Sequence, residues 1–275
     1  MSRPTARAVP ELARRMGALR PSSRQVPEEV PVALSYGGST HAVMMATPAD
    51  LTDFAIGFSL TEGIIATAGE IEEIEVLDAE EGIDLQIALR EDRSAALAAR
   101  RRHMAGPVGC GLCGIESLEQ AVRRVPSCAT ARLRLSADEI AAAVEALGEN
   151  QPLHALTRAV HGAGFFVPGE GLIAVREDVG RHNALDKLAG AVLALGRDGA
   201  HGAVVVTSRI SVEMVQKTAI LGSPILIAIS APTALAIRTA DEAGVTLVAL
   251  ARGAEFEIFT HSDRLRLEAP DADVA

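Results

Sequence analysis

Two cysteines with chemically useful spacing, Cys110 and Cys113, stand in the run Gly109-Cys110-Gly111-Leu112-Cys113-Gly114. Glycine has no Cβ, so such a stretch can place a sulfur atom at an open surface. Apolar residues then recur at helical spacing, which puts Cys113 close to the start of a predicted helix. The positive end of a helix favours a thiolate. The pattern therefore predicts sulfur chemistry.

Three other interpretations of this C-x-x-C pair remain open: half of a zinc site, a redox pair, or two small core residues. A closed zinc site needs four ligands. The third cysteine, Cys128, stands alone and is predicted to be a buried small residue, although His103 and His161 could complete a site. A thioredoxin-like pair normally follows a first strand, whereas this one lies in mid-chain after an Arg-rich stretch.

Composition narrows the class of protein. The 275 residues are 48% hydrophobic with no Trp and one Tyr, so the core must be aliphatic. A net charge of −10 argues against a general nucleic-acid binder. No apolar run is long enough for a membrane-spanning helix, and the Arg-rich start lacks the apolar segment of a secretory signal. Three cysteines make no disulfide framework, so a reducing cytoplasm is the predicted location.

The chain divides by composition into an extension, two structured parts and a tail. Residues 1–28 are rich in Pro, Arg and Ser and are predicted to be a flexible extension. Residues 29–135 form an N-terminal α+β part that carries a mobile cysteine loop at about 103–114, residues 136–265 form an α/β core, and 266–275 form a C-terminal tail.

Local patterns place elements within both structured parts. Strands are expected at 30–34 and 41–45 around a Gly-Gly turn, then a helix from Thr47 with Thr47 as its cap. Ser136 is expected to cap the next helix. Strands at 172–176, 203–207, 224–229 and 245–250 alternate with helices from about 183, 212 and 233, and a last strand covers 256–260. This alternation predicts βαβ units and a largely parallel sheet.

Polar clusters follow several of these strands, where open α/β sheets bind ligands. The clusters are Glu177-Asp178, Ser208-Arg209, Ser230 to Thr233, and Arg252-Gly253. Backbone N–H groups at a helix start, with Arg209 nearby, would bind an anion, so the series predicts a phosphate-binding rim that includes Ser208, Arg209 and Thr233. No Walker pattern or G-x-G-x-x-G supports a P-loop or a Rossmann cofactor site.

The run from Glu177 to Lys187, E-D-V-G-R-H-N-A-L-D-K, is densely polar directly after a buried-type strand. Its residues His182 and Asp186 are four apart and could share one helix face. A solvated helix start would explain the charges, but the neighbouring Leu185 and Leu188 indicate a packed helix. A functional loop is therefore predicted here.

Together these motifs resemble the formate dehydrogenase accessory sulfurtransferase family (FdhD). The strings that carry the resemblance are C-G-L-C-G, E-D-V-G-R-H-N-A-L-D-K, S-R-I-S-V-E-M-V-Q-K, A-P-T-A-L-A and L-V-A-L-A-R-G, with M-A-T-P-A-D-L and G-F-S-L-T-E-G-I-I nearer the N-terminus. They extend from about residue 30 to residue 262. The long central string is specific to the family.

The resemblance implies a sulfur carrier. Such proteins take persulfide sulfur from a cysteine desulfurase and pass it to the molybdenum of the bis-molybdopterin guanine dinucleotide cofactor before that cofactor enters formate dehydrogenase. By position, Cys110 would bear the persulfide and Cys113 would assist it or carry sulfur in turn. The stretch Leu250, Ala251, Arg252, Gly253, Ala254 and Glu255 would bind the cofactor or a guanine nucleotide, together with Ser208, Arg209, Thr233 and His182. No permanently bound metal is implied.

The resemblance also implies a three-layer, cytidine-deaminase-like α/β core with a smaller N-terminal α+β part, and a homodimer. A zinc-dependent nucleotide deaminase is a poor alternative, because its H-x-E or C-x-E motif is absent and Pro107 does not adjoin Cys110. A non-catalytic chaperone that only holds the molybdenum cofactor is the stronger alternative. It would keep the anion-binding rim but would not need Cys110.

Overall fold

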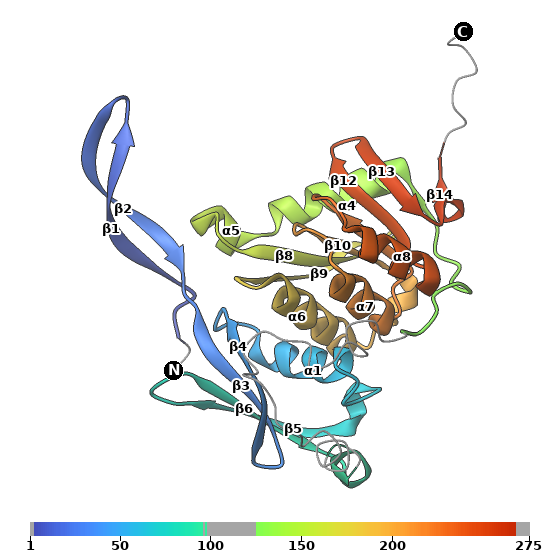
Figure 1. Ribbon diagram of the computed structural model, residues 1–275, viewed down its shortest axis with the longest axis horizontal. Helices are drawn as coiled ribbons and strands as arrows, with labels where there is room; N and C mark the ends of the chain where they lie inside the picture. Colours follow the sequence, from blue (N-terminus) through green and yellow to red (C-terminus); the bar gives the residue numbers. More distant parts are fainter. Residues whose placement is uncertain (1–2, 96, 98–124, 268–275) are drawn as a thin grey trace. The chain divides into compact units, whose positions relative to one another are not determined.

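The computed structural model describes residues 3–95, 97 and 125–267 (Figure 1). Contacts between Cα atoms divide the chain into two compact units. The first unit comprises residues 1–124, 150–163 and 174–197, and the second comprises 125–149, 164–173 and 198–275. Strands β8 (His161–Val167) and β9 (Gly171–Asp178) each contribute to both units. The predicted cysteine loop at 103–114 lies outside the described residues.

The first unit contains a four-stranded sheet of order β4-β3-β6-β5. Its strands are β3 (Val30–Tyr36), β4 (Ser39–Ala46), β5 (Ile71–Asp78) and β6 (Ile83–Leu89). The turn between β3 and β4 is made by Gly37 and Gly38, with φ of 58° and 72°, a backbone region that only glycine adopts without strain. This confirms the two strands and the Gly-Gly turn predicted there.

The first unit also contains helices α1 (Leu51–Thr61), α5 (Pro152–Thr157) and α6 (Arg181–Ala194), a 3₁₀ turn at Ala68–Glu70, and helical residues at 91–95. Two glycines set the packing of α1 against α6. A Cβ on Gly57 would lie 1.7 Å from the carbonyl oxygen of Asp186, and a Cβ on Gly190 would lie 1.9 Å from that of Asp53. The two backbones therefore touch directly, which no larger residue permits.

Residues 6–27 form a β-ribbon in place of the predicted flexible extension. Strands β1 (Ala6–Arg15) and β2 (Ala18–Pro27) pair antiparallel along their whole length, from Ala6 with Pro27 to Arg15 with Ala18. Both strands are edges of a two-stranded sheet. Their prolines have no N–H to donate, but there is no third strand whose hydrogen bonds would be lost. The Pro-rich composition, which indicated a tail, is thus compatible with paired strands.

The second unit is built on a six-stranded sheet of order β13-β12-β11-β10-β8-β9. The strands β10 (Ala203–Val206), β11 (Ile225–Ala228) and β12 (Thr246–Arg252) run parallel, while β13 (Glu255–Thr260) is antiparallel to β12. The predicted parallel βαβ units are confirmed at the centre of the sheet. The sequence prediction missed β8, and the sheet as a whole is mixed.

The helices of the second unit are α4 (Ala137–Glu149), α7 (Val212–Leu221) and α8 (Ala234–Ala243). Every residue of β10 and β11 is buried, which requires cover on both faces of the sheet. Helix α4 contacts β10, β11 and β12, and α7 and α8 connect these strands in sequence. Short pieces complete the unit: β7 (Leu135–Ser136), β14 (Leu265–Arg266), and 3₁₀ turns at Gly199–His201 and Ser262–Arg264.

Two helix starts test the predicted caps. At α4, the Glu139 amide donates to the Ser136 hydroxyl (3.2 Å) and the Ser136 amide donates to the Glu139 carboxylate (2.8 Å). This capping box confirms the predicted cap. At α1 the prediction is wrong, because the helix begins at Leu51 and the polar atoms of Thr47 are bonded elsewhere.

Candidate functional site

The ends of the parallel strands of the second unit meet along one edge. The Ile210 amide donates to the carbonyl of Ala231 (3.2 Å), and the Thr233 amide donates to the carbonyl of Ile210 (3.0 Å). The Leu250 amide lies 3.4 Å from the carbonyl oxygen of Ser230. The loops after β10 and β11 and the end of β12 are therefore held together. Three of the four predicted polar clusters belong to this edge.

The predicted anion-binding side chains on this edge differ in what they offer. Arg209 is exposed, so its guanidinium is available to a ligand. The Ser208 hydroxyl is buried and donates to the carbonyl of Arg209 (3.3 Å). The Thr233 hydroxyl caps α8 by accepting from the amide of Ala236 (3.2 Å). Because the hydroxyl is used as the cap, the features near Thr233 that fit an anion are the backbone and the positive end of α8.

The stretch 250–255 forms the turn from β12 to β13 next to an open cavity. Leu250 has φ of 54°, an uncommon conformation for a residue with a side chain, and the pairing of the two strands is irregular between Ala249 and Arg252. The cavity measures about 320 Å³ and is lined by Leu250, Arg252, Glu255, Phe256 and Glu257. Residues Arg252 to Glu255 are exposed, whereas Ala251 is buried. Unusual backbone beside an opening is common at ligand sites.

The cavity offers groups of both charges. Arg252 fits a phosphate, since a guanidinium can donate two hydrogen bonds to it. Carboxylates such as Glu255 and Glu257 accept hydrogen bonds, and the Watson–Crick edge of guanine presents N–H donors. Phe256 adds an apolar surface. One opening therefore brings together a guanidinium, carboxylates and an aromatic ring.

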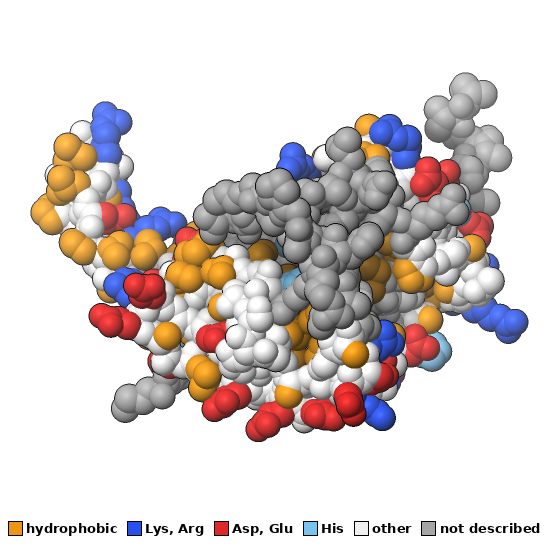
Figure 2. Space-filling view, turned by 60° about the horizontal axis from the view of Figure 1, so that its bottom comes forward, with side chains coloured by type: hydrophobic (Ala, Val, Ile, Leu, Met, Phe, Trp, Pro, Cys, Tyr) orange, Lys and Arg blue, Asp and Glu red, His pale blue; other side chains and the backbone are white. Residues whose placement is uncertain are grey.

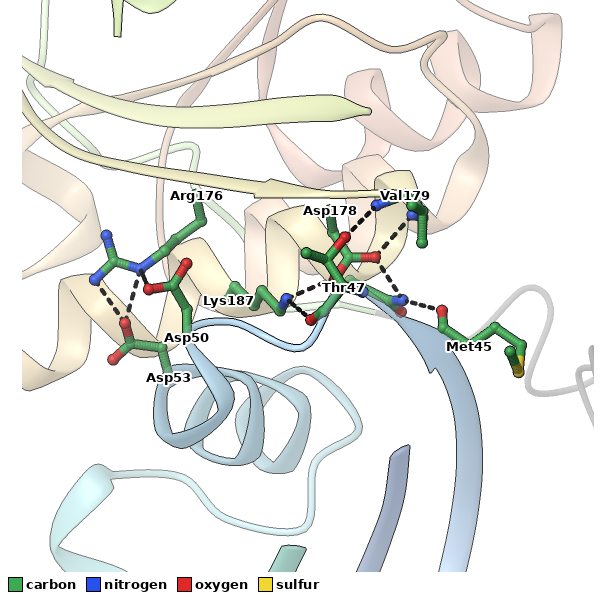
Figure 3. Close-up of polar contacts among 10 residues, drawn as sticks. Met45, Thr47, Asp50, Asp53, Arg176, Asp178, Val179 and Lys187 are labelled. Carbon is green, nitrogen blue, oxygen red and sulfur yellow. Dashed lines mark hydrogen bonds and ion pairs between the residues drawn. The ribbon is translucent and has the colours of Figure 1, made fainter. Parts of the chain in front are cut away.

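The E-D-V-G-R-H-N-A-L-D-K string lies mostly in the first unit's interior, centred on Asp178 (Figure 3). The Asp178 carboxylate accepts from the Lys187 ammonium (2.6 Å), the Thr47 amide (3.0 Å) and the Asn183 amide group (3.0 Å). The Gly180 amide donates a fourth hydrogen bond of 2.8 Å. Asp178 and Lys187 are both fully buried, so the charges are neutralised by each other and by these donors.

This buried network fixes the segment 45–47 to the start of α6. The Lys187 ammonium also donates to the carbonyl of Thr47 (2.8 Å) and lies 5.7 Å from the centre of the Phe54 ring. Asn183 donates to the carbonyl of Met45 (2.8 Å). The Thr47 hydroxyl accepts from the amide of Val179 (3.1 Å), which is why Thr47 does not cap α1.

Other polar residues of the string also make structural bonds. Both carboxylate oxygens of Glu177 accept from the amides at the start of α5, those of Leu153 and His154, at 2.8 Å each. Asp186 accepts from the Thr61 hydroxyl at 2.6 Å. Just before the string, Arg176 donates to Asp53 at 2.6 and 2.8 Å. The sequence predicted a functional loop here but did not indicate this internal bonding.

A half-buried histidine, His161, lies close to the start of α6. Burial lowers the pKa of His161 below its usual value, and the charges of Arg181 and His154 lower it further while Asp178 opposes them. The imidazole therefore keeps its neutral form to a lower pH than an exposed histidine. His182 lies in the first unit and the other predicted binding residues lie in the second, so its part in one shared site stays a prediction.

Of the three cysteines, Cys128 alone lies in the part of the chain that the structure describes. Cys110 and Cys113 lie outside the described residues. Cys128 is buried, as predicted: its sulfur contacts the carbonyl oxygen of Ser223 (3.7 Å), and its own carbonyl accepts from Arg264 (2.8 Å). Burial raises the pKa of the Cys128 thiol, which opposes thiolate formation.

Comparison with a solved structure defines the class of protein. A crystal structure from Desulfotalea psychrophila, described as a formate dehydrogenase accessory protein, matches with a TM-score of 0.77 and 27% sequence identity. The match covers 95% of this chain and all of that chain. The fold is therefore that of a mixed α/β protein of the formate dehydrogenase accessory class.

Sequence comparisons give the family. The model of the FdhD/NarQ family matches residues 27–266. A sulfur carrier protein FdhD from Agrobacterium fabrum is 66% identical over 261 residues, which cover 95% of this chain and 96% of the relative. Another from Brucella abortus is 59% identical over 259 residues, which cover 94% and 96%. This chain belongs to the FdhD/NarQ family. No helix of the described part is long and apolar enough to cross a membrane.

Proposed function

We propose that this chain is a sulfur carrier required for formate dehydrogenase activity. It accepts persulfide sulfur from a cysteine desulfurase at Cys110, assisted by Cys113. It then transfers the sulfur to the bis-molybdopterin guanine dinucleotide cofactor before insertion into formate dehydrogenase. The observation that carries the proposal is the family membership over residues 27–266, a span that includes the C-G-L-C-G run.

The acceptance step needs only a thiolate at Cys110. The Cys110 thiolate attacks the outer sulfur of the desulfurase persulfide, a new S–S bond forms, and the desulfurase cysteine leaves as a thiolate. A reducing cytoplasm keeps the thiols of Cys110 and Cys113 available, which supports a cytoplasmic location.

The molybdenum cofactor is the substrate in this account, and the edge of the second unit supports its binding. Arg209 and Arg252 are exposed and fit its phosphates, and the carboxylates of Glu255 and Glu257 fit the guanine N–H groups. His182 is also proposed to bind the cofactor, and the chain is proposed to form a homodimer. The cytidine-deaminase-like layering of the core belongs to the same proposal.

A non-catalytic chaperone for the molybdenum cofactor is the second candidate. The cavity and the exposed arginines would serve such a chaperone equally well. The two candidates differ at Cys110, which only the carrier needs.

Intact-protein mass spectrometry separates the candidates. After incubation with a cysteine desulfurase and cysteine, the wild type should gain about 32 Da per sulfane sulfur accepted. The Cys110→Ala variant should lose this gain. The matched control is Cys128→Ala, which removes a buried thiol and should still gain the mass. Two results would contradict the carrier and favour the chaperone. One is an equal mass gain in the wild type and Cys110→Ala, and the other is no gain in the wild type while guanine nucleotide still binds.

A further inference from the structure

The outer half of the ribbon, residues 12–20, exposes large apolar side chains. Leu12 and Leu19 are 69% and 68% exposed, and Met16 at the turn is fully exposed. Figure 2 shows hydrophobic and basic side chains along this ribbon. Apolar groups gathered at the end of a projecting element mark a contact surface.

The ribbon is also strongly basic in an acidic chain. Residues 6–27 carry five arginines and one glutamate, while the whole chain has a net charge of −10. Arg14, Arg15 and Arg20 lie at its outer end and are all exposed. A partner for this surface should therefore combine exposed apolar side chains with negative charge.

Strand β5, in the first unit, has both properties. It is an edge strand of its sheet, and it exposes three glutamates, Glu72, Glu73 and Glu75. Val76 and Leu77 are 44% and 40% exposed. An edge strand leaves backbone groups unpaired and accepts a further strand or ribbon readily.

The ribbon does not fold back on its own β5. Its base is held there, because Arg3 donates to Asp78 at the end of β5 at 2.8 Å. The Glu28 amide donates to the carbonyl of Thr5 at 2.8 Å and closes the base of the ribbon itself. Arg24 fixes the ribbon farther out by donating to the carbonyl of Thr157 (3.2 Å). Each strand of the ribbon has ten residues, so the turn at its far end lies about 30 Å along the ribbon from this base. Figure 1 shows the ribbon running away from β5.

We propose that the outer half of the ribbon docks on β5 of a second copy of this chain. Because each copy has one ribbon and one β5, a two-fold axis would make two identical contacts and close the assembly as a dimer. Arginines would face glutamates, and Leu12 and Leu19, which lie on one face of the ribbon, would meet Leu77. This inference assigns the contact surface of the proposed homodimer and so rests on that part of the proposed function.

Light scattering coupled to size-exclusion chromatography tests the inference on the full chain. The wild type should have the mass of a dimer. The ribbon variant Arg14→Glu/Arg15→Glu/Arg20→Glu and the strand variant Glu72→Lys/Glu73→Lys/Glu75→Lys should each weaken dimerisation at least tenfold. Combining both sets should restore the dimer, because the charges are then exchanged across the contact. A matched control, Arg132→Glu/Arg134→Glu/Arg238→Glu, changes three exposed arginines of the second unit and should stay dimeric.

A monomeric wild type, single-surface variants that remain dimeric, or a combination that stays monomeric would each overturn the inference. Far-ultraviolet circular dichroism confirms that every variant is folded. Mass gain from a desulfurase is measured on the same samples. If dimerisation responds to the variants as expected but the protein accepts no sulfur, the carrier function is contradicted and the contact surface is still supported.

Discussion

Replacing Lys187 by Met is expected to lower the free energy of unfolding by about 3–5 kcal/mol, the range found when one partner of a buried ion pair is removed. The Lys187 ammonium is fully buried and lies 2.6 Å from the Asp178 carboxylate. Without it, the negative charge of Asp178 stays buried with neutral donors alone. Urea denaturation followed by circular dichroism measures the effect.

A double variant controls for the loss of packing. In Lys187→Met/Asp178→Asn neither partner is charged, so the double variant should recover part of the stability that Lys187→Met loses. A loss below about 1 kcal/mol for Lys187→Met, or a double variant less stable than Lys187→Met, would contradict the assigned ion pair.

Replacing Gly57 by Ala is expected to cost about 3 kcal/mol or more, at or above the upper end for overpacking. The new Cβ would lie 1.7 Å from the carbonyl oxygen of Asp186, an atom of the α6 backbone. Backbone cannot rotate away as a flexible side chain can, so α1 and α6 would have to separate. Thermal unfolding and the soluble yield report the effect.

Gly148→Ala is the matched control, because Gly148 lies in α4 with no atom within 4 Å of an added Cβ. An alanine there should stabilise the protein by up to about 1 kcal/mol through its higher helix propensity. Should Gly57→Ala be as stable as Gly148→Ala, the direct contact between the α1 and α6 backbones would be wrong.

The sequence predicted the elements of the second unit well because their signals are local. The runs that became β10 and β11 are short and wholly apolar, the run that became β12 is mostly apolar, and the helices between them have regular apolar spacing. The edge that carries Arg209, Thr233 and Leu250 followed from this alternation, since parallel strands end at a common edge. The details of that edge, such as the left-handed Leu250, have no local signal.

The contacts within the first unit were not predictable in the same way. Gly57 and Gly190 are 133 positions apart in the chain, and no periodicity links them. The bond of Asp178 to Thr47 spans 131 positions, so the polar string indicated a functional loop rather than a buried network. The one available signal was the placement of Lys187 between Leu185 and Leu188 in an apolar helix.

The most direct test of the carrier function follows the sulfur itself. Cysteine labelled with radioactive sulfur is supplied to a desulfurase, this chain, and formate dehydrogenase whose molybdenum cofactor awaits sulfuration. We expect label to reach the cofactor with the wild type and with Cys128→Ala, and we expect Cys110→Ala to reduce it to the level seen without this chain. Equal labelling with Cys110→Ala and the wild type would contradict the carrier function.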